Sequence, residues 1–164
     1  MAGQRTLTII YGAAAQPRNE VARALAASLP GKAAVVSVDS LMDAIVQPDS
    51  NAIAELELVH TQLRLLVANY LKNGYDVVVQ GPFAFERDGQ RVSYESDIDQ
   101  LQALMRNLTR QSLIVRVFSS AEPDDYDAAY KPRGGERYRE FDYGSSEPRE
   151  IAESIKEVLQ VVDG

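Results

Sequence analysis

The chain has 164 residues, of which 45% are hydrophobic and 25% are charged, and its formal net charge is -7. This length and composition suit a single globular domain with a buried core, so we predict one domain over residues 1–164. The acidic balance argues against a dedicated nucleic-acid binder. The absence of cysteine excludes disulfides and thiolate metal sites, and a single histidine excludes a multi-histidine metal centre.

Neither an export signal nor a membrane segment is indicated. Residues 1–10 contain one basic residue and a short apolar run without a cleavage signal. No stretch reaches the roughly 20 apolar residues that a spanning helix needs. We therefore expect a cytoplasmic protein that makes no membrane contact.

The first predicted elements are a strand, a loop and a helix. Residues 6–11 form a short, mostly apolar run that ends at Gly12, which is typical of a buried strand. Residues 18–29 carry apolar side chains at helical spacing and end before Pro30-Gly31, so they predict a helix. A second strand is predicted over residues 33–38, and a short helix over residues 40–46.

The middle of the chain predicts a long helix followed by a buried strand. Apolar residues at helical spacing predict a helix over residues 52–72, which contains His60 as a structural or exposed histidine. The continuous apolar run 77–79 is typical of a central parallel strand covered on both faces. The remaining predicted elements are a loop or short hairpin over 84–96, a helix over 97–110, a strand over 112–118, a polar connection over 119–140, a strand over 140–143 and a helix over 148–162.

Strands that alternate with helices predict a parallel sheet with helices on both faces. In such sheets, ligands bind beyond the carboxyl ends of the strands. In this chain those ends carry Gly12, Asp39, Gln80-Gly81-Pro82 and Ser119-Ser120. The sequence therefore predicts the functional site at that edge of the sheet.

The segment that begins at Gly12 has the position of a phosphate-binding P-loop, which reads G-x-x-x-x-G-K-[ST]. The motif's first glycine is kept, but Pro17, which has no N–H, replaces the second glycine. Arg18 replaces the lysine and keeps its positive charge, and Asn19 replaces the hydroxyl residue that binds Mg²⁺. The helix N-terminus still attracts anions, but Pro17 could also do no more than start a helix. The predicted cofactor-binding residues of this segment are Gly12, Ala13, Ala14, Ala15, Gln16, Pro17, Arg18 and Asn19.

Asp39 is a second candidate, at the end of the second predicted strand in "VVSVDSLMDAI". A carboxylate there faces the region of a phosphoryl acceptor and is able to take a hydroxyl proton as a general base. Aspartate is also a common N-cap of a following helix. Both roles are open at this point.

Four stretches, taken in order, resemble the small P-loop kinases, a family that includes chloramphenicol phosphotransferase and related small-molecule and polynucleotide kinases. They cover nearly the whole chain and are the strand–loop–helix around Gly12, "VSVDSLMDAI", "NGYDVVVQGPF" and "FDYGSSEPREIAESI". The resemblance implies a three-layer P-loop NTPase fold, similar to nucleoside and shikimate kinases, with about five parallel strands. It further implies Asp39 as catalytic base, ATP or GTP with Mg²⁺ as cofactor, and the hydroxyl of a small molecule as acceptor.

The chain departs from this family where the family binds the metal. Gln80 stands where the family has an acidic residue, so we predict no metal ligand among the site residues. In place of an arginine-bearing helical hairpin, residues 119–140 form a short lid-like loop. The resemblance implies that its Arg133 and Arg137 reach the nucleotide phosphates. The alternative is a solvated basic loop on an acidic protein.

Three hypotheses follow from these features. The first is a divergent ATP-dependent phosphotransferase, the second is a catalytically inactive pseudo-kinase that serves as a ligand-binding or regulatory module, and the third is a purely structural domain. Phosphoryl transfer depends on Mg²⁺ to neutralise developing charge. The loss of two metal-positioning groups, together with a proline in the loop, argues for weak or absent transfer.

Overall fold

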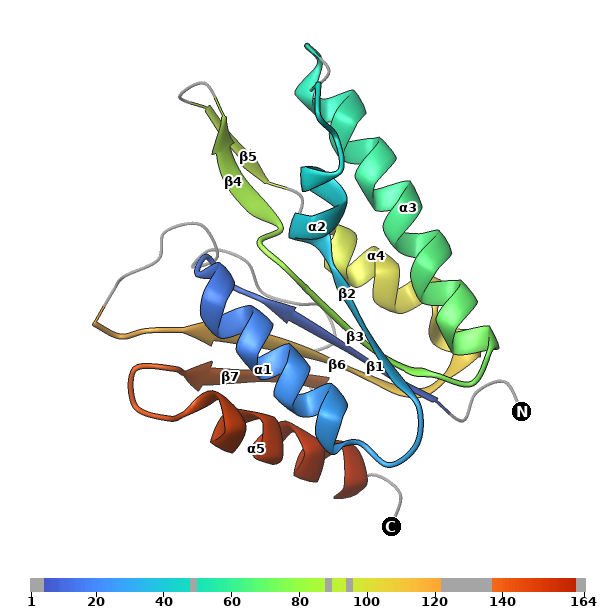
Figure 1. Cartoon of the computed structure of the whole chain (residues 1–164), viewed down its shortest axis with the longest axis vertical. Helices are drawn as coiled ribbons and strands as arrows, with labels where there is room; N and C mark the ends of the chain where they lie inside the picture. The colour runs from blue at the N-terminus through green and yellow to red at the C-terminus, as the bar shows by residue number, and fades with distance from the viewer. Residues whose placement is uncertain (1–4, 48–49, 88–89, 94–95, 122–136, 162–164) are drawn as a thin grey trace.

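The computed structural model describes residues 5–47, 50–87, 90–93, 96–121 and 137–161. Within this part of the chain, five strands form one sheet in the order β2-β3-β1-β6-β7, and every neighbouring pair is parallel. The strands are β1 (Arg5–Tyr11), β2 (Ala33–Ser37), β3 (Asp76–Gly81), β6 (Thr109–Phe118) and β7 (Tyr138–Asp142). The predicted parallel sheet of about five strands is therefore confirmed (Figure 1).

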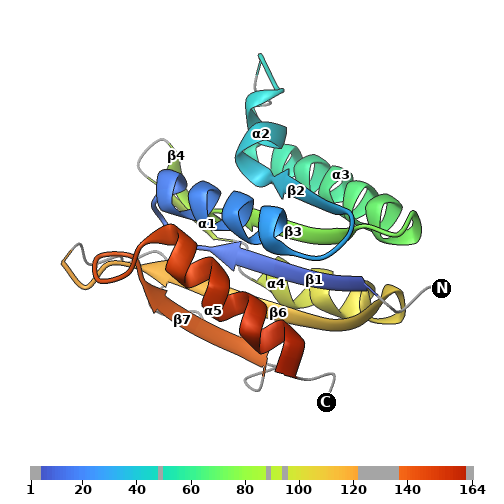
Figure 2. The ribbon, with the colours of Figure 1, turned by 60° about the horizontal axis from the view of Figure 1, so that its bottom comes forward.

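Helices cover both faces of the sheet and complete the predicted three-layer α/β architecture. Helices α1 (Ala15–Ser28) and α5 (Pro148–Val161) pack on one face, and α3 (Ala52–Lys72) and α4 (Ser96–Leu104) pack on the other (Figure 2). The short helix α2 (Val38–Asp43) lies beside α3. Among the described helices, none is both long enough and apolar enough to cross a membrane.

The central strand β1 is buried by both helical layers. Its alternate side chains enter different cores: Leu7 and Ile9 pack with residues of α3, and Ile10 packs with residues of α1 and α5. Burying one such side chain contributes about 1.5–3 kcal/mol relative to leaving it exposed. These contacts fix where β1 ends, and so they fix the position of the loop that follows it.

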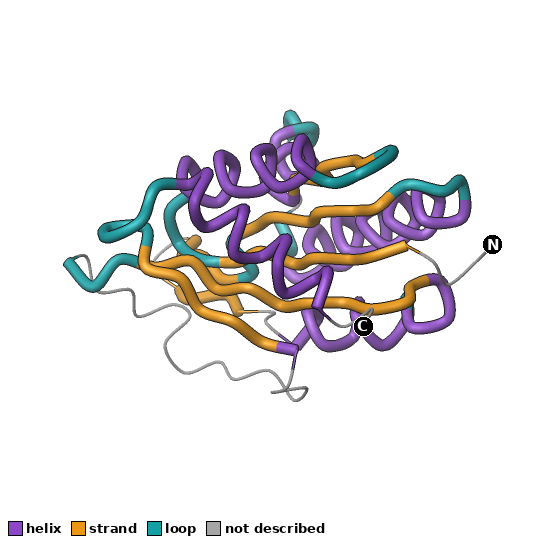
Figure 3. Tube along the Cα trace, turned by 90° about the horizontal axis from the view of Figure 1, so that it is seen from below, coloured by secondary structure: helices purple, strands orange, loops and turns teal. Residues whose placement is uncertain are grey.

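The strand order makes β1 the point from which the chain adds strands to the sheet on both sides. The chain leads from β1 to one side of the sheet through β2 and β3, and to the other side through β6 and β7. In open α/β sheets, ligands bind outside the carboxyl ends of the strands next to such a point. Figure 3 shows the loops after these ends at the side of the molecule away from the marked N-terminus. The fold thus directs attention to the edge that the sequence analysis selected.

The connection between α4 and β6 differs from the helix predicted over 97–110. Helix α4 ends at Leu104, a 3₁₀ turn follows, and β6 begins at Thr109. The reason is tertiary, because Thr109 pairs with Arg5 of β1 and the strand takes up residues that were assigned to the helix. The sheet overrides local helix propensity here.

Two further predictions agree with the structure. Helix α3 spans the predicted residues 52–72, and the side chain of Asn51 caps its first turn. Strands β4 (Ala84–Arg87) and β5 (Gln90–Ser93) pair as an antiparallel hairpin, one of the two forms predicted for residues 84–96.

His60 lies inside the core, so the structural interpretation of this residue is confirmed. The residue is 3% exposed, and its ring packs against the ring of Phe83 with a centroid separation of 5.9 Å. Its Nδ1 atom lies 3.4 Å from Oδ2 of Asp97. Burial lowers the pKa of His60 below its ordinary value, Asp97 opposes this shift, and Arg64 adds to it.

The lowered pKa of His60 predicts a loss of stability on acidification. The unfolded chain binds the proton more readily than the folded chain, so stability falls as the pH drops through the ordinary histidine pKa of about 6.5 toward the lower pKa of the folded state. Urea denaturation at several pH values should show a smaller fall for His60→Gln, which cannot titrate there. An equal pH dependence in both proteins would contradict this origin of the effect.

Candidate functional site

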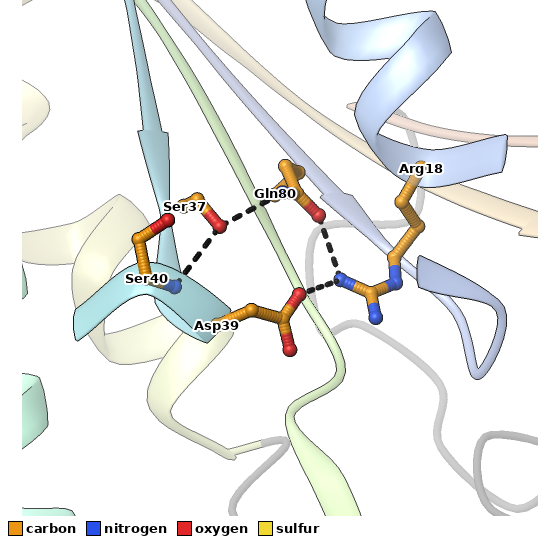
Figure 4. Close-up of polar contacts among 5 residues, drawn as sticks. All are labelled: Arg18, Ser37, Asp39, Ser40 and Gln80. Carbon is orange, nitrogen blue, oxygen red and sulfur yellow. Dashed lines mark hydrogen bonds and ion pairs between the residues drawn. The ribbon is translucent and has the colours of Figure 1, made fainter. Parts of the chain in front are cut away.

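The carboxyl ends of β1, β2 and β3 meet beneath the first turns of α1. Ser37, the last residue of β2, pairs with Gln80 of β3, and Gln80 also pairs with Ile10 of β1. Asp39 follows in α2, and Arg18 comes down from α1 (Figure 4). Three stretches that are distant in sequence, around residues 18, 37–39 and 80, therefore contribute to one polar site.

Gly12 is required by the packing of the sheet. Its φ is +153°, and a Cβ atom at this position would lie 2.3 Å from the carbonyl oxygen of Val117 in β6. The backbone of β6 thus passes too close for any side chain. This contact accounts for the glycine whether or not the loop binds phosphate.

Helix α1 begins at Ala15, so the predicted start at residue 18 is wrong. Ala14 is the N-cap and makes no side-chain capping hydrogen bond. The loop therefore consists of Gly12, Ala13 and Ala14, and the other five residues assigned to the loop lie in the helix. Pro17 is the third helical residue, where its missing N–H costs no helical hydrogen bond.

The early helix start changes which groups can meet a ligand. By helix geometry, the N–H groups of Ala15 and Gln16 have no acceptor within the helix, and Pro17 has no N–H to offer. The side chains of Ala13, Ala15 and Gln16 are exposed, and Asn19 is half-buried in the second turn. The loop after β1 is therefore short, and the start of α1 offers a ligand few backbone N–H groups.

Arg18 is the centre of the site. Its side chain is 1% exposed, and its Nη1 atom donates hydrogen bonds to Oδ2 of Asp39 at 3.0 Å and to Oε1 of Gln80 at 2.7 Å. Hydrogen bonds from an ionised donor are stronger than neutral ones, and the carboxylate also balances the charge. Arg18 thus joins α1 to the ends of β2 and β3 (Figure 4).

Ser37 and Gln80 orient this contact. The Nε2 atom of Gln80 donates to Oγ of Ser37 at 2.9 Å, which leaves Oε1 of Gln80 facing Arg18. The same Oγ accepts the backbone N–H of Ser40 at 3.3 Å and so caps α2. The interpretation of Asp39 as the cap is therefore wrong. Its carboxylate, whose side chain is 38% exposed, is directed to Arg18 instead.

Not every donor of Arg18 has an acceptor. Its Nε atom is buried and makes no hydrogen bond, and its Nη2 atom makes none with the residues that the structure describes. In Figure 4 the Nη2 atom points away from Asp39 and Gln80. Nε and Nη2 together form one edge of the guanidinium, and that edge is not used within the described protein.

Of the two predicted lid arginines, only Arg137 lies among the described residues, and it lies away from this site. Arg137 donates to Oε1 of Gln111 at 2.9 Å, near the start of β6 and so toward the opposite edge of the sheet. The structure therefore does not bring Arg137 to the loop after β1. Arg133 lies outside the described residues, as does most of the predicted lid-like loop 119–140.

A second polar cluster lies on the other face of the sheet, and sequence reasoning missed it. The hydroxyls of Tyr11 and Tyr138 are 3.1 Å apart, and Tyr138 donates to Oε1 of Glu140 at 2.6 Å. Nη1 of Arg116 lies 3.9 Å from the same carboxylate oxygen. Burial and the bond to Glu140 raise the pKa of Tyr138 to about 12, so its phenol stays protonated. Only the strand register brings these residues together.

The residues at the carboxyl edge do not fit a magnesium-nucleotide site. The guanidinium of Arg18 already supplies a fixed cation between Asp39 and Gln80. Mg²⁺ favours carboxylate and hydroxyl oxygens, whereas Asn19 and Gln80 offer neutral amides. Among the described residues, no group of three histidines, cysteines, aspartates or glutamates is placed to hold a metal ion.

Comparisons with known proteins support the fold. No protein-family model matches the sequence, and no curated protein matches it either. The crystal structure of APE1195 is similar over 99% of both chains, with 11% identity and a TM-score of 0.70. A structure from Chloroflexus aurantiacus J-10-fl, described as a "putative kinase", is similar over 98% of both chains, with 13% identity and a TM-score of 0.62. At such low identities these likenesses establish a kinase-like α/β fold and nothing finer.

The packing of Gly12 predicts that Gly12→Ala destabilises the protein by about 2–3 kcal/mol, through the clash with Val117 and the disfavoured φ. Urea denaturation measures the change. Gly74→Ala is the matched control, because Gly74 has a φ of +87° but its added Cβ would meet nothing closer than 3.7 Å. It should cost only about 1 kcal/mol. Equal losses would show that the approach of β6 is not the cause.

The ion pair predicts a strong energetic coupling between Arg18 and Asp39. Asp39→Asn should lower the free energy of unfolding by about 1–2 kcal/mol, because it leaves a buried guanidinium without its counter-charge. In an Arg18→Met background the same substitution should change stability by less than about 0.5 kcal/mol. Asp43→Asn, on the exposed part of α2, is the matched control. Additive effects in this double-mutant cycle would refute the coupling.

Proposed function

We propose that the chain is a pseudo-kinase, a kinase-fold protein that binds a small molecule but does not transfer phosphoryl groups from a magnesium nucleotide. The observation that carries this proposal is the contact of the buried Arg18 with Asp39. Asp39 is the residue for which the family resemblance implies the role of catalytic base. Its engagement by an internal cation argues against that role.

The geometry of Asp39 supports the absence of base catalysis. A general base needs a carboxylate oxygen within hydrogen-bond reach of the proton that it removes. Oδ2 of Asp39 already accepts a hydrogen bond from Arg18. An acceptor hydroxyl that approaches Oδ2 would have to compete with a charged donor that the α1 helix holds in place.

The surroundings of Arg18 argue further against the family's metal. A divalent cation near Asp39 would be repelled by the guanidinium, which is buried and so little screened. Gln80 accepts from Arg18 at 2.7 Å and adds no negative charge to offset the repulsion. Phosphoryl transfer without such a cation would lack its main source of charge neutralisation.

The fold itself supports retention of ligand binding. The carboxyl edge of the sheet still gathers polar side chains from β2, β3, α1 and α2 next to an exposed helix start. A structure of the same fold is described as a "putative kinase", which supports the choice of a kinase-fold protein. These features favour a ligand-binding module over a purely structural domain.

This proposal predicts that no phosphoryl transfer occurs. The full chain is incubated with Mg·ATP or Mg·GTP and a panel of small hydroxyl compounds, and the nucleoside diphosphate formed is measured by chromatography. We expect formation at the protein-free rate. Turnover that is lost in Asp39→Asn and retained in Asp43→Asn would overturn the proposal and support the divergent phosphotransferase.

A further inference from the structure

We infer that Arg18 takes the place of a divalent cation, so that this site binds a small phosphate-class anion without metal and Asp39 competes with that anion. The inference rests on the proposed function in one respect, namely that a magnesium nucleotide is not the ligand. It adds the class of the ligand, the residue that recognises it and the residue that opposes it.

The first observation is the unused edge of a buried cation. Arg18 is 1% exposed, yet its Nε atom is buried without an acceptor and its Nη2 atom bonds to none of the described residues. A buried donor without a partner is costly, and a ligand that accepts from it recovers that cost. Nε and Nη2 form the guanidinium edge that holds two oxygens of a phosphate at once.

The second observation is the helix start from which Arg18 comes. Helix α1 has 14 residues, and its N-cap, Ala14, provides no side-chain oxygen for the first amides. The N–H groups of Ala15 and Gln16 thus remain for an external acceptor, and the helix dipole favours an anion there. A tetrahedral phosphate has enough oxygens to accept from this turn and from Arg18, whereas a carboxylate has two.

The summed charge of Arg18, Asp39 and Gln80 bears on whether the site binds a metal ion or an anion. Arg18 carries one positive charge, Asp39 one negative charge, and Gln80 none, so the three contacting side chains sum to zero. A glutamate in place of Gln80 would make the sum negative, which favours a cation and repels an anion. The neutral amide of Gln80, held by Ser37, is therefore the feature that suits the site to an anion.

Asp39 has a role in this scheme opposite to that of a catalytic base. It forms an ion pair with the same guanidinium that the anion needs, and its side chain is 38% exposed to solvent. Removing its charge leaves Arg18 with a full positive charge for the ligand. The substitution that would abolish base catalysis should thus strengthen anion binding.

The test measures binding of inorganic phosphate to the full chain by isothermal titration calorimetry, with EDTA and separately with Mg²⁺. We expect the same affinity in both buffers. Asp39→Asn should bind about tenfold more tightly and Gln80→Glu about tenfold more weakly, which corresponds to about 1.4 kcal/mol each. Arg18→Met should lose binding, and acetate should bind more weakly than phosphate.

Two controls keep the result interpretable. Asp43→Asn removes the same charge from the same helix without contacting Arg18, and it should leave the affinity unchanged. Thermal melts of each variant show whether a loss of binding reflects unfolding, and Gln80→Glu retains an acceptor for Arg18 if Arg18→Met does not fold.

The inference is overturned by any of three results. These are no phosphate binding to either the natural chain or Asp39→Asn at concentrations up to about 10 mM, a requirement for Mg²⁺, or weaker binding by Asp39→Asn. Each result is independent of the phosphotransfer assay. A chain without turnover and without phosphate binding would leave the proposed function standing and remove this inference alone.

Discussion

The salt bridge between Arg18 and Asp39 is the interaction on which the character of this site depends. It connects α1 to the β2–α2 corner and, through Gln80, to the central strand β3. A buried guanidinium must be compensated, and the chain compensates it with one carboxylate and one amide. The consequence is a site in which the positive charge is carried by a side chain of the protein itself.

The sheet makes this interaction possible. Burial of β1 and β3 on both faces fixes where these strands end. The parallel pairing of Ser37 with Gln80 places both side chains beside each other, where Gln80 contacts Arg18. Gly12 lets β1 end against the backbone of β6, where no side chain would fit. The same constraints that stabilise the core therefore place the polar network at the sheet edge.

Much of the fold was accessible from hydrophobic periodicity alone. The alternation of strands and helices, the extent of the 52–72 helix and the doubly buried run at 77–79 are properties of local pattern, and the structure agrees with each. The start of α1 was not accessible, because Ala14 and Ala15 carry no capping signal and Pro17 is compatible with several positions in a first turn. The amino end of β6 was missed because pairing with β1 extends it.

The sequence by itself determined which residue types stand at the ends of the strands: a glycine after β1, an aspartate after β2 and a glutamine in β3, together with an arginine in α1, the helix that follows β1. Only the tertiary structure decided that Arg18 and Gln80, 62 positions apart, are in contact and that Ser37 rather than Asp39 caps α2. The physical reason is that the direction of a long side chain depends on the charges that surround it in space. Those charges come from separate strands that only the folded sheet brings together.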